Sequence, residues 1–401
     1  MPLYRGSSRV CPITVSFRNT TVKFTNDDVF HRISLNGDLV VDPDFTSFVL
    51  NSSVTNIPYP GLNHAFPGIT TILSANLNSL LTISGNYSLE RAFEGCTGLT
   101  SATFSNLTSI AGEYALSYAF YNCTNLVSID LSKVTTIGNY SLNYAFYGCN
   151  KINVVNLSSL KTMGSHGLYY AFYGCSSIET VNLSKLENIH DYGLSYAFRG
   201  CSKITSIDLS KVAIINQYGL EYGFYGCSKL ETVNLSGVTS TSGTYVFRYA
   251  FQNCTSLTSV NLSNLTTSSG TYNFYYAFAS CSRLTSVDLS NLTTADGSNE
   301  FYYAFYNCTS LTSMTFNNLS SINNTYVFRY AFRGCTSLTS LSFPSLTENS
   351  FGSNTNVFNN MLQGVSGCTV HFPAAIQSKI GSWGDVTGGF GGSNTTVLYD
   401  L

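Results

Sequence analysis

Ten of the twelve cysteines in this chain recur at a nearly constant interval, and thiols are the first side chains here that could do chemistry. Repeated cysteines can ligate a metal ion, form disulfides or supply a nucleophile. Consecutive members of this cysteine column lie 26 or 27 residues apart: Cys96, Cys123, Cys149, Cys175, Cys201, Cys227, Cys254, Cys281, Cys308 and Cys335. The chain has no Cys-x-x-Cys pair and its five histidines show no ligand spacing, so we predict no metal site and no cofactor.

The regular interval favours a structural role for these thiols. Residues at one position of a repeat project in parallel, a geometry that fits a disulfide poorly. A buried free cysteine behaves as a small apolar side chain, which is the role we expect for the column. Cys11 and Cys368 lie outside the column, and the pattern leaves their state open.

Acidic side chains form no recognisable catalytic arrangement. They are scattered over different repeats, as are Glu90, Glu179, Glu187, Asp191, Glu221 and Glu231. The chain also lacks a nucleophile motif, a His–Asp arrangement and a phosphate-binding loop. We therefore expect a protein that is not an enzyme.

Tyrosine and arginine provide the chemistry of recognition instead. Tyrosine recurs nine and five positions before most column cysteines, as at Tyr140 and Tyr144 before Cys149. These strictly periodic tyrosines are expected to stack between repeats with their hydroxyl groups in water. Tyrosine gives rigid amphipathic contact area and arginine anchors it, so we expect ligand binding at the more variable Tyr and Arg positions. The candidate ligand-binding residues are Tyr169, Tyr173, Arg199, Tyr225, Arg248, Tyr275, Tyr302, Tyr306, Arg329 and Arg333.

The composition argues against two classes of partner. Charged residues make up only 10% of the chain, against about 25% in typical domains, and the formal net charge is −2. A nucleic-acid-binding protein would show a basic stripe, which this chain lacks. No run reaches the roughly 18 apolar residues that a membrane span requires, so we expect no membrane insertion.

A repeat of 26 or 27 residues must position all of these side chains. Its Val-x-Leu pair, as at Val181 and Leu183, alternates with period two and predicts a strand with both side chains inward. Upstream of each cysteine, apolar residues at i, i+3 and i+4, as at Leu142, Ala145 and Phe146, predict a short helical turn. One such unit cannot bury its apolar face alone, so about eleven of them must stack over residues 62–363.

The outward side chains of the predicted strands are a second candidate surface. They are short and polar, as at Ser206, Asp208, Thr232 and Asn234, and could hydrogen-bond sugar hydroxyl groups. We favour the simpler interpretation that they keep a flat solvent face soluble.

Different patterns flank the repeats. Residues 1–61 are expected to form a small β-rich head that either attaches the chain to a larger assembly or caps the array. Its predicted strands are Val10–Phe17, Thr21–Phe24, Val29–Leu35 and Phe45–Leu50. Residues 364–401 are expected to form an atypical cap. The elements predicted in the cap are a strand around Val370 and Phe372, a helix at Ala374–Trp383, a glycine-rich turn at Gly388–Gly392 and a strand at Thr395–Tyr399.

The repeat resembles the BspA-type leucine-rich-repeat family. The resemblance is carried by the unit Ala-Phe-x-x-Cys-x-x-Leu-Thr-Ser, clear from Ala304 to Ser313, and it covers about Leu62 to Phe372. It implies an α/β leucine-rich-repeat solenoid with a parallel strand and a helical turn per repeat, between a small N-terminal β domain and the cap. Family members are typically surface-exposed binding or adhesion proteins of bacteria, so the resemblance implies recognition rather than catalysis.

The first residues bear on location. Leu3–Val10 resembles short N-terminal segments of phage and prophage tail-associated proteins, and residues 1–12 lack the apolar stretch of a secretory signal. Phage proteins leave the cell by lysis and need no such signal. We therefore expect a virion-associated or an extracellular, cell-surface location.

Three non-catalytic functions are consistent with these patterns. In the favoured one, the solenoid binds a cell-surface glycan or protein, and residues 1–61 dock it to a virion or tail component. The alternatives are a bacterial surface adhesin of the BspA type and a structural subunit of an assembly. The sequence determines neither the identity of the ligand nor the oligomeric state.

Overall fold

The structure is a computed structural model that describes most of the chain in two compact units. The described residues are 4–5, 8–9, 21–24, 47–50, 55–57, 61–354, 356–381 and 390–401. Unit 1 comprises Met1–Lys185 with Tyr196–Cys201, and unit 2 comprises Leu186–Ser195 with Ser202–Leu401.

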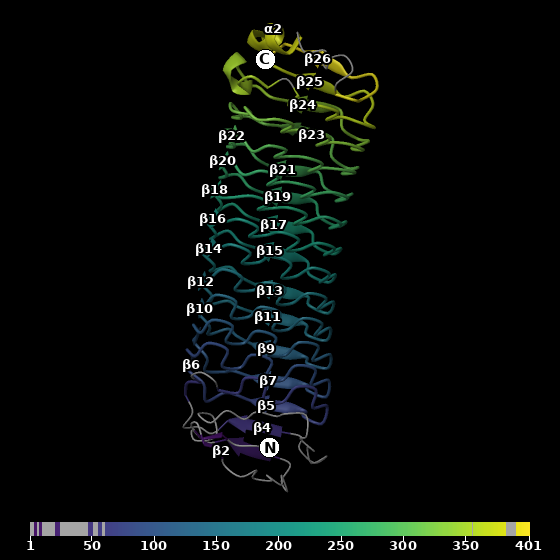
Figure 1. The fold of residues 1–401 in the computed structure, drawn as a ribbon. Coiled ribbons are helices and arrows are strands. Elements are labelled where there is room, and N and C mark those ends of the chain that lie inside the picture. The colour runs from purple at the N-terminus through teal and green to yellow at the C-terminus, as the bar shows by residue number, and fades with distance from the viewer. Residues whose placement is uncertain are drawn as a thin grey trace. The chain divides into compact units, whose positions relative to one another are not determined.

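In unit 1, strands that lie one repeat apart in the sequence form a parallel sheet (Figure 1). The strand order is β13 (Thr180–Asn182), β11 (Val154–Asn156), β9 (Ser128–Asp130), β7 (Ser101–Thr103), β5 (Ser74–Asn76), β4 (Ser47–Leu50) and β3 (Thr21–Phe24). The predicted alternation is present, because Ile129 is buried whereas Ser128 and Asp130 on either side are exposed. The register pairs equivalent residues, such as Val155 with Ile129, so each strand repeats the pattern of its neighbour.

A shorter strand follows in each of these repeats and builds a second parallel sheet. In unit 1 this sheet contains β12 (Thr162–Met163), β10 (Thr136–Ile137), β8 (Ser109–Ile110) and β6 (Thr82–Ile83). The second residue of each strand is buried, and the first is partly or fully exposed. From this strand to the next column cysteine, the chain forms the segment that carries the periodic tyrosines.

Unit 2 repeats the same plan with its own sheets (Figure 1). One sheet has the longer strands β15 (Ser206–Asp208), β17 (Thr232–Asn234), β19 (Ser259–Asn261) and β21 (Ser286–Asp288). A second has β14 (Asn188–Ile189), β16 (Ile214–Ile215), β18 (Ser240–Thr241), β20 (Thr267–Ser268) and β22 (Thr294–Ala295). A third has β23 (Ser313–Thr315), β24 (Ser340–Ser342), β25 (Thr369–His371) and β26 (Thr396–Leu398). Neighbouring strands of all three sheets pair in parallel, so the predicted parallel solenoid is confirmed within each unit.

Two of the four strands expected in an N-terminal head, β3 and β4, belong instead to the repeat sheet of unit 1. Thr21 pairs in parallel with Ser47, and Ser47 pairs in parallel with Ser74. Thr21, Ser47 and Ser74 are 26 and 27 residues apart, so these strands keep the repeat interval, which sequence reasoning did not recognise. The structure therefore places β3 and β4 in the ladder of repeats and does not confirm a separate β domain there.

The described residues before position 61 contain one further pair of strands. β1 (Tyr4–Arg5) and β2 (Ser8–Arg9) form a short antiparallel pair. The predicted strands Val10–Phe17 and Val29–Leu35 lie outside the described residues. The division of the chain at residue 61 stays a prediction.

The C-terminal end contains the strand, short helix and strand that were expected. After β25, the 3₁₀ helix η2 (Ala374–Ile376) leads into α2 (Gln377–Gly381); the last predicted helical residue, Trp383, lies outside the described part. β26 pairs in parallel with β25, so the final strand extends the same sheet. In the ranges that the structure describes, no helix has the length and apolar character to cross a bilayer.

The predicted helical turn is wrong, because the segment before each cysteine is a series of overlapping β-turns. Between Gly112 and Cys123, alternate N–H groups donate to the carbonyl three residues earlier, as Cys123 does to Phe120. The N–H groups between them donate to the next repeat, as Phe120 does to Ala145 at 2.9 Å. An α-helix would direct every N–H to the carbonyl four residues back in its own segment. Here these N–H groups are already used in one of the two other bonds, so no helical hydrogen bond can form.

The backbone conformation explains why the apolar residues of this segment have the spacing expected of a helix. In the same segment φ is 55° at Tyr114, 54° at Tyr118 and 56° at Asn122, a positive value at every fourth residue. A positive φ at the third residue alone marks a type II turn, where glycine or asparagine is usual. A non-glycine residue in this region costs about 1–2 kcal/mol. Two of the three positions carry the periodic tyrosines, so their ring contacts must offset that cost.

Phenylalanines and the column cysteines fill the space inside the turns. In unit 1, Phe93 stacks on Phe120 with ring centroids 5.4 Å apart. All ten column cysteines are buried thiols outside any disulfide, as predicted, and so is Cys368. The thiol of Cys123 donates to the Phe93 carbonyl at 3.1 Å, and that carbonyl also accepts the Cys96 N–H at 3.1 Å. The column therefore links consecutive repeats by hydrogen bonds as well as filling volume, while Cys11 lies outside the described residues.

The column thiols should resist alkylation in the folded protein. Burial raises the pKa of Cys281 and of Cys335 to about 12, so little thiolate exists at neutral pH. We expect iodoacetamide to leave all ten unlabelled in the native chain and to label them after unfolding, as peptide mass spectrometry would show. Native-state labelling of Cys281 at the rate of a free cysteine would contradict the burial described above.

Substitution at a positive-φ tyrosine separates backbone strain from ring stacking. Tyr276 has a φ of 52° and its ring stacks on that of Tyr303, 4.7 Å away. Tyr276→Phe keeps the ring, and the change in unfolding free energy should stay within about 0.5 kcal/mol. Tyr276→Val loses the ring and places a β-branched residue at positive φ, so a loss of about 2 kcal/mol or more is expected. Tyr276→Gly removes the backbone strain and should destabilise the protein less than Tyr276→Val does. Equal stability of the valine and phenylalanine variants in denaturant unfolding would refute the stabilising role assigned to ring stacking.

Candidate functional site

The outward side chains of the turn segments form what we call the tyrosine side of each unit. In unit 1, Tyr114 stacks on Tyr140 with centroids 4.6 Å apart, and Tyr118 stacks on Tyr144 at 4.7 Å. The rings are nearly parallel, at 10° and 4°, and all four side chains are half-buried. The predicted stacking of the periodic tyrosines is thus confirmed. Because neighbours cover the ring faces, the edges and hydroxyl groups are what these tyrosines offer to a ligand.

Three of the predicted ligand-binding residues lie in unit 1, on adjacent repeats. The Tyr173 ring stacks on that of Tyr147 at 4.8 Å. The Arg199 guanidinium carbon lies 5.6 Å from the ring centroids of both Tyr173 and Tyr196. Tyr169 meets Tyr196 edge to face at 6.3 Å. All three predicted residues are half-buried, so each is partly held in place and partly accessible.

Arg248 leads a second group, in unit 2. Its guanidinium lies 4.7 Å from the Tyr245 ring centroid and 5.8 Å from that of Tyr275, another predicted residue. It also forms an ion pair with Glu221 at 3.1 Å, in which the Glu221 side chain is only 7% exposed. Burial raises the pKa of Glu221, while Arg248 acts against that rise. The charge of Arg248 is therefore largely neutralised within the protein.

Tyr225 is also placed in unit 2, one repeat before Arg248. Its hydroxyl oxygen accepts a hydrogen bond from the Asn253 side-chain amide at 3.1 Å. The Tyr225 and Tyr222 rings lie 5.6 Å apart in a tilted arrangement. Tyr225 is half-buried like the other predicted residues, so its hydroxyl group contributes to the same polar surface.

The other predicted residues of unit 2 lie on three consecutive repeats. Tyr275 stacks on Tyr302 at 5.4 Å, and the Arg329 guanidinium lies 5.7 Å from the Tyr302 ring centroid. Tyr306 and Arg333 come together in the same way, at 5.8 Å. The structure thus brings Tyr275, Tyr302 and Arg329 into one row of contacts and pairs Tyr306 with Arg333 beside it.

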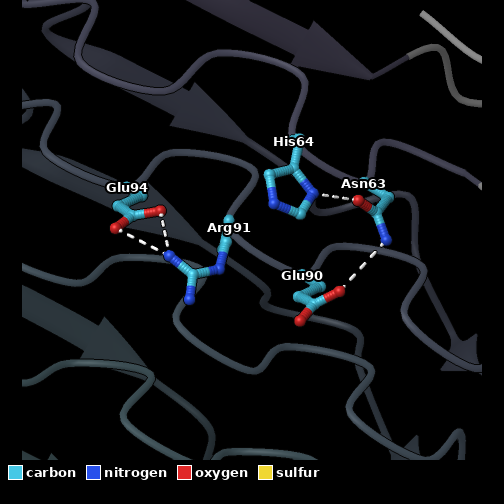
Figure 2. A network of polar contacts seen from close by, with 5 residues as sticks. All are labelled: Asn63, His64, Glu90, Arg91 and Glu94. Atoms are coloured by element: carbon cyan, nitrogen blue, oxygen red, sulfur yellow. Dashed lines mark hydrogen bonds and ion pairs between the residues drawn. The ribbon is translucent and has the colours of Figure 1, made fainter. Parts of the chain in front are cut away.

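The first turn segments of unit 1 carry charged and amide side chains where later repeats carry tyrosine (Figure 2). The Asn63 amide contacts His64 and donates to Glu90 at 3.2 Å. Arg91 donates to both carboxylate oxygens of Glu94, at 3.0 and 2.9 Å. These partly exposed contacts contribute about 1 kcal/mol or less each. The acids of this network are already engaged with basic or amide partners, which argues against catalysis there.

The guanidinium of Arg91 connects this network to the tyrosines that follow. It lies 4.3 Å from the Tyr118 ring centroid. Within the described ranges, no group of three or more His, Cys, Asp or Glu side chains gathers as a metal ion would require.

The outward face of the strands has a structural use that the sequence did not reveal. The Asp208 and Asn234 side chains accept hydrogen bonds from the N–H groups of Ser210 and Ser236, at 3.0 and 3.1 Å. The Asn261 side chain likewise accepts a hydrogen bond from the N–H group two residues later. Such Asx turns end the strand and begin the turn that follows it. The polar strand residues therefore shape the repeat, which supports the solvent-face interpretation over sugar binding.

A fully buried carboxyl group in unit 2 was missed by sequence reasoning. Glu300 accepts a hydrogen bond from the Ser268 hydroxyl group, and the Asn273 amide donates to the same hydroxyl at 3.2 Å. The other carboxyl oxygen, Oε2, has no hydrogen-bond partner among the residues that the structure describes. Burial raises the pKa of Glu300 to about 8, so the group is mostly protonated at neutral pH. The sequence did contain a sign that this position is buried. Val246 and Val327 occupy the same position of other repeats, directly before a buried phenylalanine.

The buried Glu300 should make stability depend on pH. Its folded-state pKa lies above the unfolded value, so its contribution is fully present below about pH 4.5 and falls as pH rises toward about 8. One such proton gives a slope of up to about 1.4 kcal/mol per pH unit. Glu300→Gln should flatten this part of the curve of unfolding temperature against pH, whereas Glu231→Gln, at an exposed carboxylate, should not. Unchanged slopes in Glu300→Gln would contradict the raised pKa.

Comparison with known proteins supplies the family. No curated protein matches the chain. Solved structures that match the chain include a leucine-rich repeat protein from Bacteroides ovatus, with 22% identity over 86% of this chain and 88% of that chain and a TM-score of 0.38. Another is a leucine rich cell surface protein from Faecalibacterium prausnitzii, with 18% identity over 86% and 83% and a TM-score of 0.36. The family model for the BspA type leucine rich repeat region matches residues 42–143, 116–249, 169–301 and 221–364. These matches span most of the sequence, and the chain therefore belongs to the BspA-type leucine-rich-repeat family.

Proposed function

We propose that this chain is a non-catalytic recognition protein that binds a cell-surface glycan or protein through the tyrosine side of its repeats. One observation carries the proposal. Alternating with the stacked tyrosines are half-buried positions whose residue type changes from repeat to repeat, such as Glu90, Tyr169, Arg248 and Arg329. A position needed only for stacking would keep one residue type. Variation at ordered, partly exposed positions is what a recognition surface requires.

Preorganisation supports the same surface. Immobilising a long side chain on binding costs about 0.5–1.5 kcal/mol. Here the Arg329 guanidinium already lies between 4.7 and 5.7 Å from the ring centroids of Tyr326, Tyr330 and Tyr302. Much of that cost is therefore met during folding. The strand face offers shorter side chains, several of which are occupied by Asx turns.

Cell-surface location is proposed from the family, whose members are typically surface-exposed proteins of bacteria. Two settings fit a recognition solenoid: a bacterial adhesin, and a virion protein that residues 1–61 attach to a tail. Because β3 and β4 extend the repeat ladder, we favour a capping role for their part of the chain. That supports the adhesin over the tail-docked protein.

A cell-binding experiment tests the recognition function. Fluorescently labelled full-length chain is added to a panel of bacterial strains and to mucosal epithelial cells. We expect selective binding that falls by about tenfold or more in Tyr302→Ser/Tyr306→Ser, since aromatic anchors dominate recognition surfaces. A matched variant, Ser259→Gln/Ser286→Gln, places two longer side chains on the strand face and should bind as the wild type does.

Circular dichroism and thermal unfolding show that both variants are folded before binding is compared. Selective binding to bacterial strains would point to a phage-type receptor role, and binding to mucosal cells would point to an adhesin. Loss of binding only in the strand-face variant would contradict the assigned surface. No binding to any cell by a folded chain would contradict recognition and favour a structural subunit.

A further inference from the structure

Positive charge is concentrated on the tyrosine side of unit 2, although the whole chain has a formal net charge of −2. The turn segments 272–280, 299–307, 326–334 and 356–364 contain three charged residues, namely Glu300, Arg329 and Arg333. Glu300 is fully buried beneath this surface, and burial raises its pKa to about 8, so it carries little charge at neutral pH. The two arginines therefore determine the charge that a ligand meets on these four segments.

Arg329 and Arg333 are held beside each other by the same ring. Their guanidinium carbons lie 5.1 and 5.9 Å from the Tyr330 ring centroid. Each also contacts the repeat before, where Arg329 approaches Tyr302 at 5.7 Å and Arg333 donates from Nη1 to the Tyr303 hydroxyl oxygen at 3.1 Å. Both side chains are half-buried. A guanidinium packed against rings keeps N–H groups at its edge, which can pair with a carboxylate.

A third arginine of the same unit, Arg248, differs from these two because a carboxylate neutralises its charge. Arg248 occupies the position of the repeat that Arg329 occupies three repeats later. Its neighbour in the preceding repeat is Glu221, and the two form an ion pair at 3.1 Å. The corresponding neighbour of Arg329 is Tyr302, which cannot neutralise it. Among the residues that the structure describes, no carboxylate forms an ion pair with Arg329 or Arg333.

The regular row of tyrosines around the two arginines favours a repeating ligand. Tyr276, Tyr303 and Tyr330 stack at centroid distances of 4.7 and 4.8 Å, so their hydroxyl groups recur at the interval of the repeats. Their ring faces are covered, which leaves hydrogen-bonding edges rather than apolar faces for a partner. A polymer of hydroxyl-bearing units can follow such a row, whereas a folded acidic protein presents no matching periodicity.

We infer that the tyrosine side of unit 2 binds a carboxylated polysaccharide, with Arg329 and Arg333 pairing with its carboxylates and the neighbouring tyrosine hydroxyl groups hydrogen-bonding its sugars. This inference rests on the proposed recognition function and adds the chemical class of the ligand to it. The ion pairs supply charge selectivity, because a neutral glycan cannot replace them. They also make binding sensitive to salt, since partly exposed charge pairs are screened.

Binding of defined polymers to the full-length chain tests the inference. Fluorescein-labelled polygalacturonate is titrated with the protein and followed by fluorescence anisotropy, with neutral dextran of equal mass as the control polymer. We expect binding to polygalacturonate, little binding to dextran and a loss of affinity as salt rises. Arg329→Gln/Arg333→Gln should weaken binding by about tenfold or more, because each arginine contributes a charge-assisted hydrogen bond.

Two further variants guard against an indirect effect. Arg283→Gln removes one positive charge from an exposed position of unit 2 outside these turn segments and should bind as the wild type does. Arg329→Lys/Arg333→Lys keeps the charge without the planar fork and should bind with intermediate affinity. If the glutamine variant proves unfolded by circular dichroism, the lysine variant and the salt dependence of the wild type decide the question.

Several outcomes would overturn the inference. Equal binding of dextran and polygalacturonate, or unchanged affinity in the folded glutamine variant, removes the role of the arginines. Equally tight binding of poly-L-glutamate would assign the site to acidic polypeptides instead. If the chain binds cells but none of the acidic polymers, the recognition function stands and the ligand class proposed here is wrong.

Discussion

The division of backbone hydrogen bonds in the turn segments is the constraint on which the rest of this structure depends. Alternate N–H groups close turns within one repeat, and those between them donate to the next repeat. The pattern leaves few backbone groups unsatisfied, as a buried or stacked segment requires. It can be maintained only if φ becomes positive at every fourth residue, as at Tyr114, Tyr118 and Asn122. A side chain at those positions must therefore either tolerate a positive φ, as asparagine does, or offset its cost by packing.

The tyrosine side and the cysteine column are both consequences of that constraint. A tyrosine at positive φ is unfavourable alone, but in a stack of repeats its ring meets an identical ring on each side, as at Tyr144 between Tyr118 and Tyr170. On the inner side, the turns leave room for a small residue that can also donate a hydrogen bond, and a cysteine thiol meets both needs. The outward positions between the stacked tyrosines are less constrained. Recognition can vary there without disturbing the fold.

Much of the fold was predictable from the sequence, because period and alternation report directly on burial. The cysteine interval identified the repeat, and pairs such as Val181 and Leu183 identified the parallel strands. The turn segment was not predictable in the same way. Overlapping β-turns and a helix both place apolar residues at i, i+3 and i+4, and they differ in their hydrogen bonds and φ values, which the sequence does not display. The strands β3 and β4 were predicted, but their repeat interval was not recognised, so they were assigned to a separate head.

The candidate site was predictable in composition but not in arrangement. The sequence identifies which tyrosines are periodic and which positions vary, and the stacking of the former follows. It does not show that Arg248 is neutralised by Glu221 while Arg329 has a tyrosine in the equivalent place. Nor does it show that Glu300 lies inside the fold, since a single glutamate in a column of mostly small, uncharged residues is weak evidence alone. Both findings depend on contacts between residues about one repeat apart.

The central claim is that the turns present the tyrosine side as the surface that binds. Hydroxyl-radical footprinting of the full chain, with and without bacterial cells or surface polymer that it binds, measures this most directly. We expect binding to protect Tyr275, Tyr302 and Tyr306, while the outward residues of β19 and β21 keep their reactivity. Protection confined to those strands, with the tyrosines unchanged, would contradict it.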